Sequence, residues 1–236
     1  MCPFLRKYIM ELVMTGMLLV SFYFLSRQAA AVSVWMNSGK VQTEEKVIVL
    51  DPGHGGSDPG MIGVDGLEEK GVNLSVALLL REKLEKKGFT ILMTREKDQG
   101  LYDETAQNKK AQDMQRRIAL IDETAPVLTV SIHQNSYPDP EVKGPQVFYY
   151  ETSEKGKKLA EDIQESLNTM LKAERPRKIK GNTSYYLLKR SKGVLVIAEC
   201  GFLTNPEEAS LLQTEEYREK VADALAEGIG RYLQKQ

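Results

Sequence analysis

The chain has 236 residues, of which 42% are hydrophobic and 28% are charged, and its formal net charge is -1 at pH 7. These values are ordinary for a globular protein, and the length suits one domain with a sizeable core better than two. The balanced charge argues against nucleic acid as a partner, because proteins that bind it carry a marked excess of Lys and Arg.

The first 31 residues differ in kind from the rest. Arg6 and Lys7 precede a stretch without charges from residue 12 to 25, and small residues end the segment at Ala31. This order is typical of a secretory signal peptide, whereas a membrane span usually needs about 20 apolar residues. We expect residues 1–31 to be a signal peptide cut after Ala31 or an uncleaved N-terminal membrane anchor. Either alternative places the rest of the chain outside the cytoplasm.

A linker and a strand come next. Residues 32–45 lack periodicity and contain many small or polar side chains, so we expect a linker there and a catalytic domain over 46–236. The β-branched run over 47–50 predicts a buried strand, which passes into a loop rich in Gly and Pro over 51–60.

Helix-like and strand-like segments then alternate along the chain. The helices show apolar residues near every fourth position, and the strands show short apolar runs. In chain order we expect a helix over 72–87, a strand over 89–94, a helix over 113–124, strands over 127–132 and 147–150, a helix over 153–172, strands over 185–188 and 194–199, and a helix over 214–234. The first strand, helix and strand form a β-α-β unit, for which a right-handed parallel crossover is strongly favoured. The pattern predicts an α/β fold.

The only two histidines, His54 and His133, both stand just past the end of a strand-like run. Ligands of open α/β sheets gather beyond the carboxyl ends of the strands, so two imidazoles delivered there can converge. Neutral imidazole is the commonest protein ligand of zinc, and the pair is therefore a candidate metal site. The competing interpretation is that each histidine is a hydrogen-bonded structural residue.

A hydrolytic zinc centre needs a third protein ligand and an open position for water. The acidic residues that follow or precede His54 closely in the sequence are Asp51, Asp58, Asp65, Glu68 and Glu69. Glu68 and Glu69 stand just before the first helix, where the helix dipole also favours negative charge. Spacing alone does not choose between these two.

Glu199 is the candidate general base, which must take a proton from water and pass it to the leaving nitrogen. It ends the apolar strand over 194–199. Burial opposes the ionisation of a carboxyl group, so a glutamate at this position is seldom kept for stability. Cys200 lies in the same apolar pattern and is expected to be a buried small residue rather than a nucleophile.

Two common motifs are absent from the sequence. It contains no His-Glu-x-x-His segment, which excludes the helical zinc-protease arrangement. It also contains no Gly-x-x-x-x-Gly-Lys-Ser/Thr segment, and the glycines around His54 fit neither common nucleotide-binding pattern. Nucleotide binding is therefore disfavoured.

Five ordered blocks across residues 46–233 resemble a known family. The blocks are Val49 to Gly60, Leu67 to Lys70 followed by Asn73 and Leu74, Met93 to Arg95, Ser131 to Asn135, and Ala198 to Asn205. In this order they resemble the zinc-dependent N-acetylmuramoyl-L-alanine amidases of bacterial cell-wall metabolism. The resemblance implies a single α/β domain with a twisted, mostly parallel sheet of about six strands flanked by helices.

The resemblance also implies the roles of the candidate residues. His54, Glu69 and His133 correspond to the family's Zn²⁺ ligands, and Glu199 to its catalytic acid/base. Glu69 is preferred because the family's ligand directly precedes the lysine matched by Lys70. The implied reaction is hydrolysis of the amide bond between N-acetylmuramic acid and L-alanine in peptidoglycan, in which zinc polarises the carbonyl and activates water.

Two residues depart from the family's pattern. Gln134 stands where a small residue usually follows the second histidine, and Cys200 stands where an aliphatic residue usually follows the glutamate. Neither change removes an implied ligand.

The compact form with a leader segment most resembles the germination-specific amidases of spore formers. This resemblance implies a role in the spore cortex, an extracytoplasmic location in the cell wall or forespore intermembrane space, and peptidoglycan as the partner. The N-terminal segment would provide any membrane contact, and an activating protein, if there is one, is unknown. Two alternatives stay open: a zinc peptidase or amidohydrolase that acts on a different amide, and a catalytically inactive wall-binding protein.

Overall fold

The computed structural model describes residues 14, 16, 17, 21, 23 and 46–236. The expected signal peptide or anchor therefore lies outside the described residues except at five positions, and the expected linker lies wholly outside them. Within the part of the chain that is described, no helix has the length and apolar character needed to cross a membrane. Residues 46–236 cluster as one unit.

Strands and helices alternate through this unit, as the sequence pattern predicts. The elements are β1 (Val47–Pro52), η1 (Val64–Gly66), α2 (Glu69–Lys86), β2 (Thr90–Met93), α3 (Lys109–Thr124), β3 (Leu128–Asn135), β4 (Gln146–Tyr150), α4 (Glu154–Met170), β5 (Lys180–Asn182), α5 (Tyr186–Arg190), β6 (Leu195–Phe202), α6 (Pro206–Gln213) and α7 (Glu215–Gln234).

The six strands form one sheet in the order β2-β1-β3-β6-β4-β5. β1 pairs in parallel with β2 and β3, and β3 pairs in parallel with β6. β4 pairs antiparallel to β6 and parallel to β5. The expected α/β domain with a mostly parallel sheet of six strands is confirmed.

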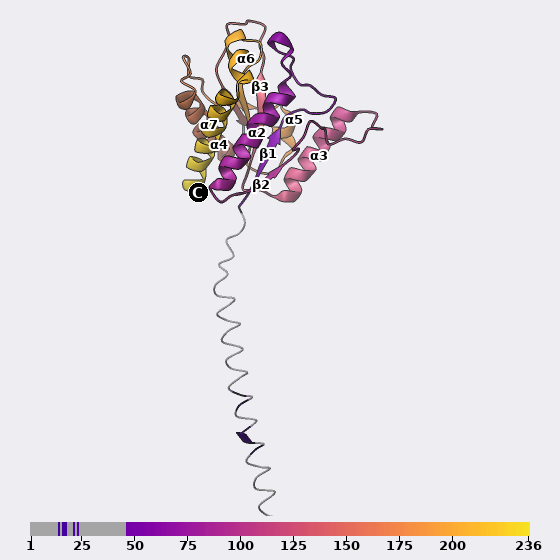
Figure 1. Ribbon diagram of the computed structural model, residues 1–236, viewed down its shortest axis with the longest axis vertical. Helices are drawn as coiled ribbons and strands as arrows, with labels where there is room; N and C mark the ends of the chain where they lie inside the picture. The colour runs from indigo at the N-terminus through magenta and orange to yellow at the C-terminus, as the bar shows by residue number, and fades with distance from the viewer. Residues whose placement is uncertain (1–13, 15, 18–20, 22, 24–45) are drawn as a thin grey trace, which may run out of the picture. The chain divides into compact units, whose positions relative to one another are not determined.

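Helices cover both faces of the sheet. α2, α4 and α7 lie over one face, and α3 and α5 lie over the other (Figure 1). Alternation along the strands divides the core accordingly, so that Leu50 and Val130 pack toward the larger helical layer while Val49 and Ile197 pack toward the smaller one. Cys200 is fully buried in the larger core, as expected.

One predicted element is wrong. Residues 185–188 are not a strand, because Tyr186–Arg190 form α5, and the sixth strand is the unpredicted β5 at Lys180–Asn182. Leu187 and Leu188 are buried against the smaller core, and a run this short presents an apolar face in a helix as readily as in a strand.

Helix caps account for two further differences. α3 begins at Lys109, before the predicted start at 113, because the Asn108 side chain accepts a hydrogen bond from the Ala111 backbone and caps the helix. α6 was not predicted, although its start carries a recognisable signal. The Asn205 side chain accepts from the Glu208 backbone, and Pro206 occupies the first turn.

Candidate metal centre

The strand order brings the two histidines together. β1 and β3 are parallel neighbours with Pro52 opposite Ile132, so His54 just after β1 and His133 near the end of β3 lie at the same edge of the sheet. The prediction that His133 follows its strand is wrong, because β3 continues to Asn135. The imidazole rings of His54 and His133 lie with their centroids 4.9 Å apart at an interplanar angle of 80°. The predicted convergence at the carboxyl edge is therefore what the structure contains.

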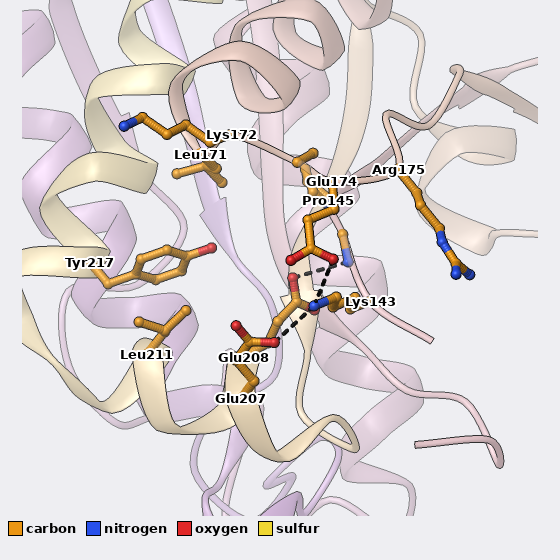
Figure 2. Close-up of a pocket in the computed structure, with 12 residues that line it drawn as sticks. Lys143, Pro145, Leu171, Lys172, Glu174, Arg175, Glu207, Glu208, Leu211 and Tyr217 are labelled. Carbon is orange, nitrogen blue, oxygen red and sulfur yellow. Dashed lines mark hydrogen bonds and ion pairs between the residues drawn. The ribbon is translucent and has the colours of Figure 1, made fainter. Parts of the chain in front are cut away.

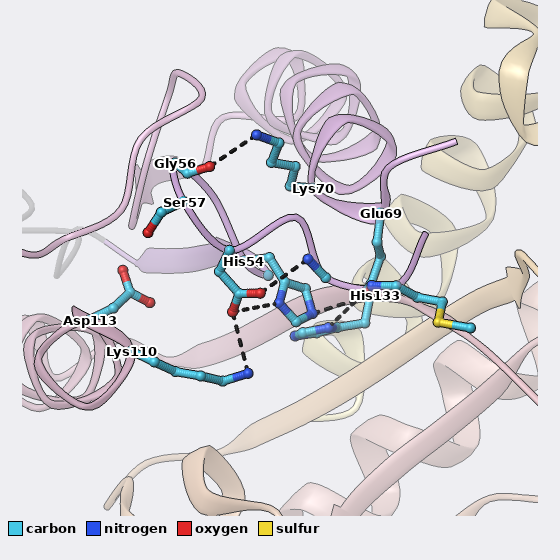
Figure 3. A network of polar contacts seen from close by, with 12 residues as sticks. His54, Gly56, Ser57, Glu69, Lys70, Lys110, Asp113 and His133 are labelled. Carbon is cyan, nitrogen blue, oxygen red and sulfur yellow. Dashed lines mark hydrogen bonds and ion pairs between the residues drawn. The ribbon is translucent and has the colours of Figure 1, made fainter. Parts of the chain in front are cut away.

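Glu69 joins the histidines from the first position of α2 (Figure 3). Its Oε2 lies 3.1 Å from His54 Nε2, and its Oε1 lies 2.9 Å from His133 Nδ1. One ligand atom from each of these three residues lies within 4.8 Å of the others. The Glu69 side chain is 4% exposed, whereas the histidines are about one-fifth exposed, at 20% and 22%. The cluster thus has a buried carboxylate and an accessible side made by two imidazoles.

The surroundings hold the Glu69 carboxylate as an anion. Backbone amides of Met61 and Gln134 donate to it at 2.9 and 3.1 Å. Burial raises the pKa of Glu69, but hydrogen bonds and charge from His133 and His54 outweigh that effect and hold the pKa well below its usual range. Burial likewise lowers the pKa of His54, but its bonds to Asp58 and Glu69 prevail and raise the pKa to about 9. The two carboxylates therefore stabilise positive charge at His54, and binding of a metal ion there would release the proton of the imidazole.

The other acidic candidates occupy different places. Glu68 is half-exposed and pairs with Lys70 at 3.4 Å, so the structure brings Glu69 and not its neighbour to the histidines. Asp58 Oδ2 lies 3.0 Å from His54 Nδ1. Asp51 lies within the sheet below the loop, and Asp65 lies in the short helix η1.

The backbone that carries His54 is unusual. His54 has a φ of 62°, a left-handed conformation that is uncommon for a residue other than Gly. Two buried arginines bind the carbonyl oxygens of this turn: Arg95 Nη2 donates to Gly53 O at 2.9 Å, and Arg117 Nη2 donates to His54 O at 2.6 Å. Gly53 itself has no room for a side chain, because a Cβ there would collide with the His133 ring. The conformation is thus determined by tertiary contacts.

The donor set fits a metal ion. Two imidazoles and one carboxylate are the ligands of many hydrolytic zinc sites, with the remaining position left for water or substrate. His54 Nδ1 donates a hydrogen bond to Asp58 Oδ2. The other ring nitrogen, Nε2, faces Glu69 and is therefore free to bind a metal. The third ligand group, the Glu69 carboxylate, is oriented by hydrogen bonds from the backbone amides of Met61 and Gln134. The chemistry and spacing of the cluster therefore match a three-ligand metal centre.

Glu199 stands beside this cluster. It lies on β6 directly opposite His133 of β3. Burial raises the pKa of Glu199 to about 7, with the charges of His133 and His54 opposing the rise and that of Glu69 adding to it. Its Oε2 is buried and has no hydrogen-bond partner among the described residues. A carboxyl group poised near neutrality, with a free acceptor atom, is suited to proton transfer.

A cavity of about 220 Å³ adjoins the cluster. His54 lines it from the loop after β1, and His133 and Glu199 line it from β3 and β6. Further lining residues come from α3 and from α5 with the residue that precedes it. Tyr185 and Tyr186 form part of this wall. These tyrosines were not predicted as site residues, because residues 185–188 were expected to form a strand of the sheet. Lys110, at the rim, is largely exposed and lies 3.5 Å from Asp58 Oδ2.

A second, smaller hollow of about 100 Å³ has other residues around it (Figure 2). Three of its charged side chains pair with one another, since Lys143 lies 3.1 Å from Glu174 and 2.8 Å from Glu207. None of the candidate site residues lines it. This hollow therefore has the character of a structural ion-pair cluster.

Comparison with known proteins agrees with this geometry. Residues 48–231 match the family model described as N-acetylmuramoyl-L-alanine amidase. The chain is similar to the germination-specific N-acetylmuramoyl-L-alanine amidase of Bacillus subtilis (strain 168), at 39% identity over 191 residues that make up 80% of each chain.

Solved structures show the same similarity. The CwlD amidase from Clostridioides difficile, solved in complex with the GerS lipoprotein, matches with a TM-score of 0.78 and 38% identity, over 81% of this chain and 100% of that one. The amidase AmiC2 of Nostoc punctiforme matches with a TM-score of 0.70 and 31% identity, over 80% of this chain and 98% of that one. Fold and sequence thus agree, and the chain belongs to the N-acetylmuramoyl-L-alanine amidase family.

Proposed function

We propose that the chain is a zinc-dependent enzyme that hydrolyses the amide bond between N-acetylmuramic acid and L-alanine in peptidoglycan. The observation that carries this proposal is the convergence of His54, Glu69 and His133, whose ligand atoms lie within 4.8 Å of one another beside the buried Glu199. The first three residues would hold Zn²⁺, and Glu199 would act as the catalytic acid/base.

The residues divide the reaction between them. Bound Zn²⁺ supplies a Lewis acid for the amide carbonyl and for water. Glu199 takes a proton from the water whose oxygen bonds to the lactyl carbonyl carbon, and it delivers a proton to the nitrogen of L-alanine as the carbon–nitrogen bond breaks. The products are a carboxylate on the glycan and a stem peptide with a free amino terminus. Burial raises the pKa of Glu199 to about 7, so this carboxyl holds a proton more readily than an exposed glutamate, which supports its role as a proton donor.

The cavity walls would position the substrate. Tyr185 and Tyr186 are partly exposed beside the site and provide flat surfaces for the apolar parts of a saccharide or peptide. Lys110 stands at the rim with most of its side chain in solvent, where its ammonium group can attract the carboxylates of a stem peptide. Arg117, at the base, is engaged by Asp51 and Asp113 and therefore serves structure.

A digest of purified muropeptides tests the reaction. The zinc-loaded protein should release peptides that begin with L-alanine together with glycan that lacks peptide. Cleavage only within the peptide would instead indicate a zinc peptidase or amidohydrolase of another specificity. Binding to peptidoglycan without any cleavage, in a protein that takes up no zinc, would indicate an inactive wall-binding protein.

We further propose that residues 1–31 direct export or anchor the chain, that 32–45 form a linker, and that 46–236 act outside the cytoplasm. A role in spore cortex maturation is supported by the similarity to the germination-specific amidase of B. subtilis. The related C. difficile amidase was solved with the GerS lipoprotein, which supports a protein partner for this chain as well. Expression in a B. subtilis strain that lacks its germination-specific amidase tests the role: the chain should restore cortex peptidoglycan whose muramic acid has lost its peptides.

A further inference from the structure

Gln134, one of the two departures from the family's pattern, is linked to the metal cluster by side-chain hydrogen bonds. Its side chain is buried, with the residue only 4% exposed, and its Nε2 donates to Asn73 Oδ1 at 3.2 Å. Asn73 Nδ2 in turn donates to Glu69 Oε1 at 3.1 Å and contacts Gly53 O at 3.3 Å. Two amides thus connect residue 134 to the third member of the cluster.

The direction of this relay follows from what each group can donate. The ionised Glu69 carboxylate only accepts hydrogen bonds, so Asn73 must present its NH₂ group to it. The carbonyl oxygen of Asn73 then faces Gln134, and Gln134 must donate a hydrogen bond to it from its own NH₂ group. If Gln134 did not donate, Asn73 would keep a buried carbonyl without this partner and would be held in one orientation less firmly.

The register of the sheet puts Gln134 in this place. His133 lies opposite Glu199, but Asn135 lies opposite Phe202, so two residues of β6, Cys200 and Gly201, face Gln134 alone. Such irregularities next to active sites re-aim side chains. Cys200, the other departure from the family's pattern, is one of these two residues and is fully buried. The two departures are therefore adjacent in space.

For stability alone, the gains and losses at Gln134 nearly cancel. Its Oε1 is buried and, within the described part of the chain, has no hydrogen-bond partner. A buried amide oxygen left unpaired costs free energy of folding. An apolar side chain of the same size would avoid this cost but would leave Asn73 Oδ1 buried without this donor, so the donor offered to Asn73 is what a glutamine contributes here.

We propose that Gln134 is a positioning residue, which acts through Asn73 to hold the Glu69 carboxylate in the orientation needed to bind Zn²⁺. The proposal rests on the metal centre described under the proposed function. It concerns how firmly this chain binds the metal and leaves the reaction itself unchanged.

The variant Gln134→Met tests the proposal, because methionine keeps the length of the side chain and removes the donor. Two quantities are measured on the full chain. They are the Zn²⁺ dissociation constant, by competition with a chelator, and the thermal midpoint of unfolding of the metal-free protein. We expect the dissociation constant to rise about tenfold or more, as for other groups that orient metal ligands. The midpoint of the metal-free protein should change little, because the variant removes one buried unpaired oxygen and leaves another at Asn73. An unchanged dissociation constant would overturn the proposal.

Gln164→Met is the matched control. Gln164 is also buried, but its Oε1 accepts from the Val147 backbone at 2.8 Å and its Nε2 donates to Pro145 O at 3.0 Å. This variant should lower the thermal midpoint and leave the Zn²⁺ dissociation constant unchanged. Gln134→Met should thus change mainly the Zn²⁺ dissociation constant and Gln164→Met mainly the thermal midpoint. This contrast distinguishes a positioning role from a role in stability.

A double-mutant cycle tests the route through Asn73. Asn73→Leu alone should weaken Zn²⁺ binding, and adding Gln134→Met to it should cause little further loss, because the relay is already broken. Full additivity of the two losses would contradict the route. If the wild-type chain binds no Zn²⁺, the proposed function and this inference both fail; if it binds Zn²⁺ and Gln134→Met binds it equally well, only this inference fails.

Discussion

Arg117 and Asp51 form a buried ion pair beneath the turn that carries His54. Arg117 Nη1 lies 2.6 Å from Asp51 Oδ1, and both side chains are 2% exposed. The other terminal nitrogen of Arg117 donates to the His54 carbonyl oxygen at 2.6 Å. The pair therefore connects the centre of the sheet with the backbone of a candidate metal ligand, and it affects both stability and the site.

Removing Arg117 should be costly. Arg117→Met leaves the Asp51 carboxylate buried without its partner, and breaking such a pair typically costs about 3–5 kcal/mol. We expect the free energy of unfolding, measured by urea denaturation, to fall by an amount of this order. Arg116→Met is the control, because Arg116 pairs with Asp103 in solvent and should have little effect. Equal losses of unfolding free energy in the two variants would show that the buried pair stabilises the fold no more than the exposed pair does.

Acid should weaken the same pair. Burial raises the pKa of Asp51, but the charge of Arg117 and the hydrogen bonds from Ser131 and Thr94 outweigh it and lower the pKa to about 2, from an ordinary value of 3.8. A carboxyl group whose folded-state pKa is lowered stabilises the fold fully above its unfolded value and loses that contribution as pH falls through the folded value. The difference in unfolding free energy between wild type and Asp51→Asn should therefore shrink as pH falls from about 4 to about 2. A constant difference over that range would contradict the pKa assigned to Asp51.

Glu199→Gln should separate catalysis from metal binding. The substitution removes the group proposed to move protons, so hydrolysis should fall by about 100-fold or more. Metal content should be unchanged, because Glu199 is not part of the proposed ligand set. Hydrolysis assays and metal analysis of the same preparation check both points, and a fully active variant would overturn the role of Glu199.

The same substitution should stabilise the metal-free protein at neutral and alkaline pH. Burial raises the pKa of Glu199 to about 7 from an ordinary value of 4.5, so its ionisation opposes folding as pH rises. The advantage of Glu199→Gln should be small near pH 4 and should grow as pH passes from about 5 to 7. Thermal midpoints of both proteins across this range test the sign. A midpoint difference that does not change with pH would show that the carboxyl is not protonated in the fold.

Two neighbouring glutamates provide a test of the third ligand. Glu69→Gln should lower the affinity for Zn²⁺ by at least about tenfold, because it removes the carboxylate between the two histidines. Glu68→Gln should leave the affinity unchanged, since Glu68 pairs with Lys70 near the surface. Chelator competition with both variants measures the difference. A loss confined to Glu68→Gln would reverse the assignment.

Much of the fold follows from local patterns. The buried strands β1, β3 and β6 appear in the sequence as continuous apolar runs, and the long helices appear as apolar residues every four positions. Local patterns failed where an element was short. The run at 185–188 had too few residues to distinguish a strand from the helix α5, and this error concealed two tyrosines that line the cavity.

The sequence by itself determined that both histidines and Glu199 stand in or just after apolar strand segments, because hydrophobic periodicity and turn residues are local properties. Tertiary structure alone decided which of these groups meet. The adjacency of β1, β3 and β6 set the convergence of the histidines with Glu199, and the first turn of α2 set Glu69 rather than Glu68 between them. Pairing of Arg117 with Asp51 depends on strand order and helix packing, and so does the relay from Gln134 to Glu69. Distances between residues far apart in the chain arise from packing, which no local spacing encodes.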